Sequence, residues 1–196
     1  MAIRKIAQLG EPVLRRRARE LSADELSSSY VTRLIEDLID TMRDADGAGL
    51  AAPQIYESVQ LVVIEVRSNP RYPNVEPIAL TLLVNPRVTP LGVTASGELP
   101  EEESISVYEG CLSVAGLRGR VQRPRRVRVE ALDPSGSPVT LLWEGFRAAV
   151  VQHETDHLHG TLFVDRAPPQ SLTFLREYER YVPAEQRVVD AAKVAR

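Results

Sequence analysis

The stretch that most constrains this chain is VVQHETDHLHG at residues 150–160, which contains all three of its histidines. His153 and His157 are four residues apart, and on a helix such side chains lie on the same face. Glu154 stands next to the first of them, which completes the pattern H-E-x-x-H. This pattern supplies two imidazoles for a metal ion and one carboxylate for proton transfer.

The residues before the histidines indicate that this helix is buried. Phe146 and Val150 precede His153 at intervals of four and three, so the imidazoles continue an apolar stripe. Buried imidazoles need a polar partner, and a metal ion supplies one. The spacing therefore predicts a buried, metal-binding helix over residues 145–158, with Gly160 as its C-terminal cap.

The composition is that of a soluble globular protein, with 43% hydrophobic and 26% charged residues among 196. A net charge of −3 argues against direct nucleic-acid binding. The sequence shows neither the apolar segment of a secretion signal nor the run of about 18 apolar residues that a membrane span requires. Cys111 is the one cysteine, so no intramolecular disulfide forms. Together these features predict a cytoplasmic protein without a membrane segment.

The remaining patterns predict an α+β fold, with antiparallel or mixed sheets packed around the histidine helix. Ser22 and Glu25 have the spacing of a capping box and are expected to begin an amphipathic helix. The turn residues at 133–136 are expected to close a hairpin. In chain order we expect a helix from residue 22 to about 44–49, strands over 59–66 and 78–86, a hairpin over 126–145, the histidine helix, and a last amphipathic helix over 170–181.

Several arginines lie close together before and within the first strand of the predicted hairpin. They are Arg123, Arg125, Arg126 and Arg128. Such a cluster can bind nucleic acid, but here the segment RVRVEAL alternates charged with apolar residues. We therefore expect these arginines on the exposed face of a strand.

Two histidines do not complete a catalytic metal site, which usually has three protein ligands and one position for water. A metzincin is excluded because Phe163 stands where its third histidine would be. Glu177 as third ligand would make a zinc metalloprotease, whereas Cys111 offers a thiolate suited to a transition metal. A non-catalytic module stabilised by metal is a further alternative, although no good fourth ligand accompanies Cys111. The residue pattern alone leaves these alternatives open.

Three motifs resemble those of the peptide deformylase family and occur in the same order. They are GAGLAAPQ at 47–54, EGCLS at 109–113 and QHETDHLHG at 152–160. The resemblance implies one catalytic domain over residues 1–196, with a core at about 5–166 and a C-terminal helix and tail at about 170–196. The segment 92–104 and the tail match nothing in the family's pattern. The stretch SVAGLRGRVQRP resembles a subgroup that contains bacterial and organellar enzymes.

The resemblance implies a hydrolase that removes the formyl group from N-formylmethionine of new polypeptides, near the ribosome. Cys111, His153 and His157 would hold one divalent metal ion, commonly ferrous iron, with zinc, nickel or cobalt able to substitute. Such an ion lowers the pKa of bound water toward about 7 and so provides a hydroxide nucleophile. Glu154 would act as general acid and base.

The resemblance also implies which residues contact the substrate. The side-chain amide of Gln54 and the backbone N–H of Leu112 would stabilise the oxyanion. An apolar pocket would receive the methionine side chain, and nearby backbone would pair with the peptide as an added strand. The implied substrate-binding residues are Ala48, Gly49, Gly110, Arg118, Phe146, Ala149 and Val150, of which the last three would line the pocket.

Overall fold

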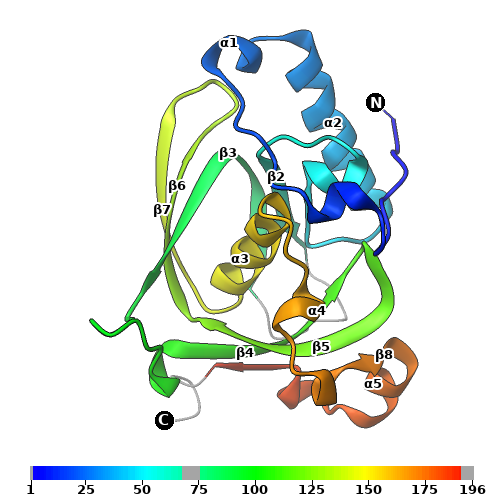
Figure 1. Ribbon diagram of the computed structural model, residues 1–196, viewed down its shortest axis with the longest axis vertical. Helices are drawn as coiled ribbons and strands as arrows, with labels where there is room; N and C mark the ends of the chain where they lie inside the picture. Colours follow the sequence, from blue (N-terminus) through cyan, green and yellow to red (C-terminus); the bar gives the residue numbers. More distant parts are fainter. Residues whose placement is uncertain (1, 68–75, 191–196) are drawn as a thin grey trace.

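The computed structural model describes residues 2–67 and 76–190, which form an α+β fold with two antiparallel sheets (Figure 1). One sheet has five strands in the order β1-β2-β3-β6-β7, and the other has four in the order β8-β5-β4-β9. The strands are β1 (Gly49–Ala51), β2 (Leu61–Val66), β3 (Ile78–Leu91), β4 (Ser104–Cys111), β5 (Val114–Pro124), β6 (Arg126–Leu132), β7 (Pro138–Glu144), β8 (Thr173–Phe174) and β9 (Val188–Asp190).

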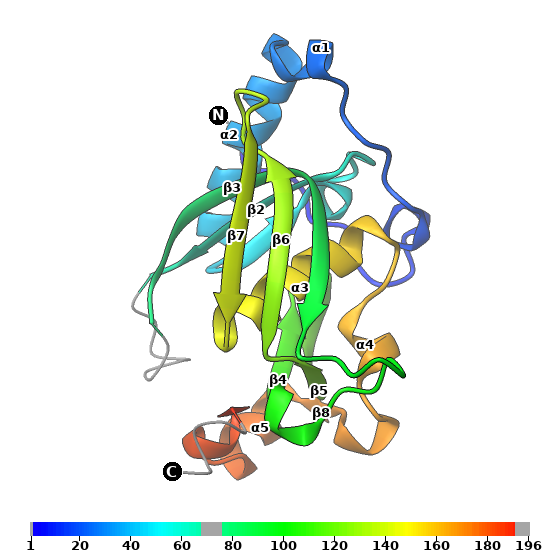
Figure 2. The ribbon, with the colours of Figure 1, turned by 90° about the vertical axis from the view of Figure 1, so that its left-hand side faces the viewer.

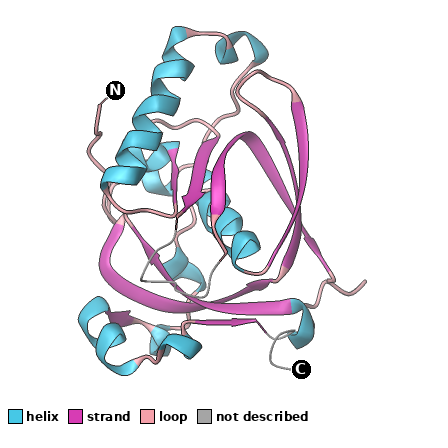
Figure 3. Cartoon of the chain, turned by 180° about the vertical axis from the view of Figure 1, so that it is seen from behind, coloured by secondary structure: helices cyan, strands magenta, loops and turns pink. Residues whose placement is uncertain are grey.

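The helices are arranged around and between these sheets (Figure 3). The α-helices are α1 (Ala23–Leu26), α2 (Ser29–Asp44), α3 (Phe146–Leu158), α4 (Phe163–Arg166) and α5 (Leu175–Tyr181). Short 3₁₀ helices are η1 (Pro12–Arg15), η2 (Ala52–Ile55), η3 (Glu101–Glu103), η4 (Pro169–Ser171) and η5 (Ala184–Gln186). In the part of the chain that the structure describes, no helix combines the length and apolarity that crossing a bilayer requires.

Helix α3 lies between the two sheets and contacts strands of both. It is buried on more than one side, since Ala148, Val151 and Leu158 are inaccessible to solvent in addition to the predicted stripe. The helix ends where the sequence predicts, and Gly160 beyond it has a φ of +74°, which favours glycine. A Cβ at Gly160 would lie 2.8 Å from the backbone of Arg15, so the N-terminal segment also requires glycine there.

The predicted first helix is instead two helices. The capping box at its start is present, because Ser22 accepts a bond from the Glu25 backbone N–H and Glu25 accepts one from Ser22. However, α1 lasts only one turn, and Ser28 begins α2 by accepting a bond from the backbone N–H of Val31. A second N-cap serine thus restarts the helix. The apolar face of α2 then packs on β1 and β2, as its periodicity predicts.

The hairpin of β6 and β7 is confirmed. Asp133 closes its turn by accepting bonds from the backbone N–H groups of Ser135 and Ser137. The exposed-face prediction holds for Arg128, whereas Arg126 is only partly exposed. It is wrong for Arg123, which is 3% exposed. The reason is that acidic side chains from β4 and α3 surround its guanidinium. The side chain of Arg125 is also mostly buried, so it too departs from the prediction.

Other predicted boundaries shift. Strand β2 begins at Leu61, two residues later than predicted, and β3 continues past residue 86 to Leu91. The last helix, α5, begins at Leu175, because η4 and the short strand β8 occupy the first part of the segment predicted as helical. Most of residues 69–77, which connect the two predicted strands, lie outside the described residues.

Candidate active site

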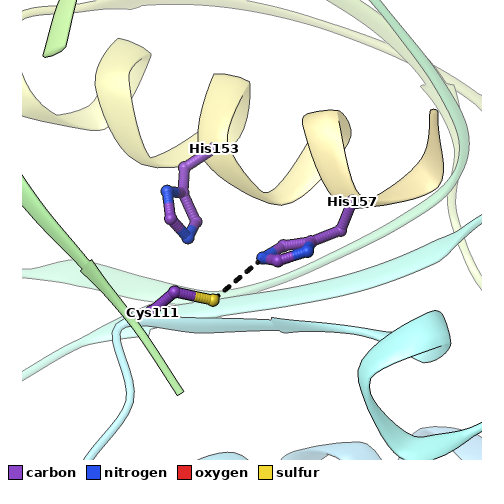
Figure 4. A group of neighbouring side chains, drawn as sticks. All are labelled: Cys111, His153 and His157. Carbon is purple, nitrogen blue, oxygen red and sulfur yellow. Dashed lines mark hydrogen bonds between the residues drawn. The ribbon is translucent and has the colours of Figure 1, made fainter. Parts of the chain in front are cut away.

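Three potential metal ligands meet between the end of β4 and helix α3. Figure 4 shows Cys111 and the imidazoles of His153 and His157 pointing toward one another. Their ligand atoms all lie within 4.8 Å of one another. Cys111 Sγ and His157 Nε2 are 3.2 Å apart, and the three side chains are largely buried. The hairpin of β4 and β5 therefore supplies the sulfur, and one face of α3 supplies both imidazoles.

Glu109 fixes the orientation of the first imidazole. His153 Nδ1 donates to Glu109 Oε2 at 2.8 Å, so Nε2 is the ring nitrogen left for a ligand. Arg123 Nη2 donates to the same carboxylate at 2.9 Å, and Arg123 Nη1 donates to Asp156. Burial alone raises the pKa of Glu109, but the charge and hydrogen bonds of Arg123 and His153 outweigh it and lower this pKa to about 2. The group that accepts the hydrogen bond from His153 Nδ1 is therefore a negatively charged carboxylate.

The same surroundings favour the thiolate form of Cys111. Burial by itself raises the pKa of this thiol. The charge of His157 and hydrogen bonds from both histidines outweigh burial and hold the pKa well below its ordinary value. Because the thiolate is the form of cysteine that binds metals, the position is suited to a ligand role.

Glu154 is buried on the same helix as the two histidines of the potential metal site. Its Oε2 has no hydrogen-bond partner among residues 2–67 and 76–190, and burial raises the pKa of its carboxyl to about 7. A carboxyl whose pKa lies near neutrality can both accept and return a proton. Gly49 of β1 packs directly against it, since a Cβ at Gly49 would lie 2.5 Å from Glu154 Oε1. The strand can approach the carboxylate this closely because it carries glycine there.

This contact leads to a prediction for Gly49→Ala. The added methyl group must displace the Glu154 carboxylate, and a misplacement of about 1 Å can cost on the order of 10² in turnover. We expect kcat to fall by that order while metal content stays at the wild-type level. Introduced into a Glu154→Gln background, the same substitution should cause little further loss. Additive losses in the double variant would show that Gly49 does not act through Glu154.

Gln54 lies across the site from α3. Its Oε1 accepts a bond from the backbone N–H of Ala51 at 2.8 Å, which determines the orientation of the amide. Its Nε2 consequently faces Cys111 Sγ at 3.5 Å and Ser113 Oγ at 3.2 Å. Leu112 follows Cys111 in the turn between β4 and β5. Both residues that the family resemblance assigns to the oxyanion therefore border Cys111.

Residues 7–9, here named the N-terminal tie, connect these two regions. The backbone N–H of Ala7 donates to Gln54 O, and that of Leu9 donates to Ser113 O, each at 2.7 Å. Between them, Gln8 Nε2 donates to Leu112 O at 3.1 Å. No local sequence pattern predicts this arrangement, because the bonded partners are about 47 to 104 residues apart in the chain.

A cleft of about 730 Å³ opens onto the site. Its lining includes Gln54, Cys111, Leu112, His153 and Glu154, and also all seven implied substrate-binding residues (Ala48, Gly49, Gly110, Arg118, Phe146, Ala149 and Val150). His157 is buried, 1% exposed, and does not line the cleft. The side chain of Glu177 is 43% exposed, lies beside Arg176 and is not part of the Cys111–His153–His157 group.

Sequence reasoning missed several residues of the cleft. Among them are Arg43, Glu65, Arg67, Val107, Glu109 and Leu175. Glu109 belongs to the EGCLS motif, so a search for a carboxylate to orient a histidine could have found it. The others lie on α2, β2, β4 and α5 or at their ends, and no local pattern marks them.

Comparison with known proteins decides the family. A family model described as polypeptide deformylase matches residues 3–172. The chain belongs to the peptide deformylase family. Peptide deformylases are hydrolases that remove the N-formyl group from nascent polypeptides, so the enzyme class that the motifs imply is confirmed. The zinc metalloprotease and the non-catalytic module are thereby rejected.

Curated and solved peptide deformylases resemble the chain over most of its length. The peptide deformylase of Leptospira biflexa is 42% identical over 167 residues, 85% of this chain and 88% of that protein. Peptide deformylase 2 of Pseudomonas syringae pv. tomato is 44% identical over 166 residues, 84% and 87% of the two chains. A class I type b peptide deformylase from Acinetobacter baumannii, solved with Met-Ala-Ser bound, has a TM-score of 0.76 at 38% identity and covers 84% of this chain and 98% of its own.

Proposed function

We propose that Cys111, His153 and His157 hold one divalent metal ion, ferrous iron, which zinc, nickel or cobalt can replace. The convergence of the sulfur and nitrogen atoms within 4.8 Å carries this proposal. One thiolate and two imidazoles form a donor set that suits transition metals and disfavours magnesium and calcium. The buried Oε2 of Glu154, without a partner in the described chain, also fits a site that is completed by a further group.

In this proposal Glu154 moves the proton. A divalent cation held by the three ligands supplies a Lewis acid and lowers the pKa of water. Glu154 accepts the proton of the water that attacks the formyl carbon and then delivers it to the departing amine, so that formate and a free amino terminus result. Its raised pKa, about 7, supports both directions of transfer.

The oxyanion that forms at the formyl carbon needs hydrogen-bond donors. We propose that the Gln54 side-chain amide and the Leu112 backbone N–H provide them. The bond from Ala51 to Gln54 Oε1 supports this role, because it holds the amide NH₂ toward Cys111 before substrate arrives. A donor oriented in advance does not have to reorganise during the reaction.

We propose that the substrates are N-formylmethionyl nascent polypeptides, met in the cytoplasm near the ribosome. Phe146, Ala149 and Val150 would receive the methionine side chain. Backbone around Ala48, Gly49 and Gly110 would pair with the peptide, and Arg118 would lie along its exit. The Met-Ala-Ser peptide bound by the Acinetobacter baumannii relative supports a cleft that accepts methionine first.

The direct test is formate release from formyl-Met-Ala-Ser by protein purified without oxygen. We expect turnover together with about one equivalent of metal per chain. Metal-replete protein that releases no formate from this peptide would contradict the proposed substrate. The metals in the protein as purified, measured by elemental analysis, test the assignment of iron.

A prediction for Gln54 follows from the oxyanion proposal. Removal of one oxyanion donor typically costs about 10²–10³ in turnover. We therefore expect Gln54→Ala to lower kcat by that factor, with metal content unchanged. Gln122→Ala, on the exposed side of β5, serves as the matched control and should keep wild-type turnover. If Gln54→Ala raised only KM, Gln54 would bind substrate without stabilising the oxyanion.

A further inference from the structure

The C-terminal segment 173–190 lies beyond the residues that match the family, which end at 172. It nevertheless adds a strand to each edge of the β4–β5 hairpin. Strand β8 pairs with β5, and β9 pairs with β4. Figure 2 shows this segment, in orange and red, on the outer side of that hairpin. A segment beyond the family match is thus built into the sheet that carries Cys111.

Specific contacts hold this segment in place. The ring of Tyr178 is buried, and its centroid lies 5.5 Å from that of Tyr108. The guanidinium of Arg187 lies 4.9 Å from the centroid of the Tyr178 ring, and Arg187 O accepts a bond from the Tyr108 N–H. Strand β9 then places Val188 opposite Val107. Helix α5 is therefore fixed on the hairpin from both of its ends.

Two residues of the segment reach the substrate cleft or its supports. Leu175, the first residue of α5, lines the cleft itself. It follows the β8 residues Thr173 and Phe174, which pair with Arg118 and Leu117. Val188 packs against the cluster of Ile105, Val107 and Ala149, with Phe146 at its border. Val188 therefore packs against residues of the apolar pocket, and Leu175 adds to the lining of the cleft that Arg118 also lines.

We propose that Leu175 determines specificity by contacting an apolar side chain at the second or third position of the peptide. This inference rests on the proposed function, in which the apolar pocket is taken by methionine. Successive residues of an extended peptide are about 3.3 Å apart and alternate in direction, so the following side chains meet the wall beyond that pocket. Leu175 supplies an apolar side chain to the wall of the same cleft that Arg118 lines, and Arg118 pairs in the sheet with Thr173, two residues before Leu175.

The test compares formyl-Met-X-Ala and formyl-Met-Ala-X peptides, with X as alanine, leucine or phenylalanine. The readout is the ratio of kcat/KM for the large residue to that for alanine at each position. Each methylene group buried contributes about fourfold. We expect the wild-type chain to favour the large residues at one position, and Leu175→Ala to reduce that ratio about fourfold or more. Leu175→Asp should reduce it further, because a charged side chain opposes apolar contact.

Arg176→Ala is the matched control, since its side chain is 86% exposed on the same helix and does not line the cleft. It should keep the wild-type ratios. Equal ratios in the wild-type chain and in Leu175→Ala, at both positions, would overturn the inference. Failure of the proposed function would give another result: the wild-type chain would release formate from none of the peptides. Metal content and circular dichroism establish that each variant is folded.

Discussion

Glu154→Gln is expected to lower kcat by about 10²–10⁴-fold, the usual contribution of a positioned acid–base group. Glutamine has nearly the same size, so the packing against Gly49 is retained, but it cannot accept the proton of the attacking water. Because Glu154 is not among the three proposed ligands, metal content should stay at the wild-type level. Steady-state formate release and elemental analysis of the same preparation measure both quantities.

The control for this variant is Glu130→Gln, which changes an exposed glutamate on β6 and should leave turnover unaltered. Near-normal turnover in metal-replete Glu154→Gln would contradict the proton-transfer role. Loss of metal in that variant would show instead that the carboxylate contributes to metal binding. The two readouts therefore distinguish a chemical role from a ligand role.

Cys111→Ala should abolish stoichiometric metal binding and, with it, activity. The substitution removes a negative charge and the sulfur donor that lies beside His157 Nε2. Only the two imidazoles then remain as ligands. Two neutral nitrogen ligands are too few for a stable site, which usually takes three protein ligands. Elemental analysis after anaerobic purification, together with formate release, provides the measurement.

Glu177→Ala serves as the comparison, because Glu177 is the other ligand that the sequence offered. Its exposed side chain on α5 lies outside the ligand group, so both metal content and turnover should remain near wild type. Full metal in Cys111→Ala combined with loss in Glu177→Ala would reject the proposed site. The pair of variants thus tests the ligand assignment without relying on activity alone.

The helix that carries the histidines could be predicted because its information is local. Its apolar spacing, its H-E-x-x-H pattern and its terminal glycine all lie within residues 146–160, and α3 follows them closely. The position of Cys111 beside the histidines could not be predicted from local sequence, since its partner His157 is 46 residues away. Residue chemistry favoured the thiolate but left Glu177 as an alternative, and the family motifs decided for the cysteine.

Arg123 shows why other predictions were wrong. Its segment alternates like an exposed strand face, but three-dimensional neighbours decide its environment. Glu109 from β4 and Asp156 from α3 enclose the guanidinium, and neither is near it in sequence. The division of the first helix at Ser27 and Ser28 has a local cause, a second N-cap, that periodicity alone does not detect. The cleft contact of Leu175 likewise depends on pairing between β8 and β5.

The N-terminal tie has a consequence for local unfolding. Ala7 and Leu9 donate to the backbone of Gln54 and Ser113, which belong to segments far apart in the chain. Opening of either segment breaks a bond to the same three residues, so we expect η2 and the turn after Cys111 to open together. Hydrogen exchange at the amides of Ala7 and Leu9 should therefore report the opening of the segments that carry the proposed oxyanion donors, although neither residue has a proposed role in the chemistry.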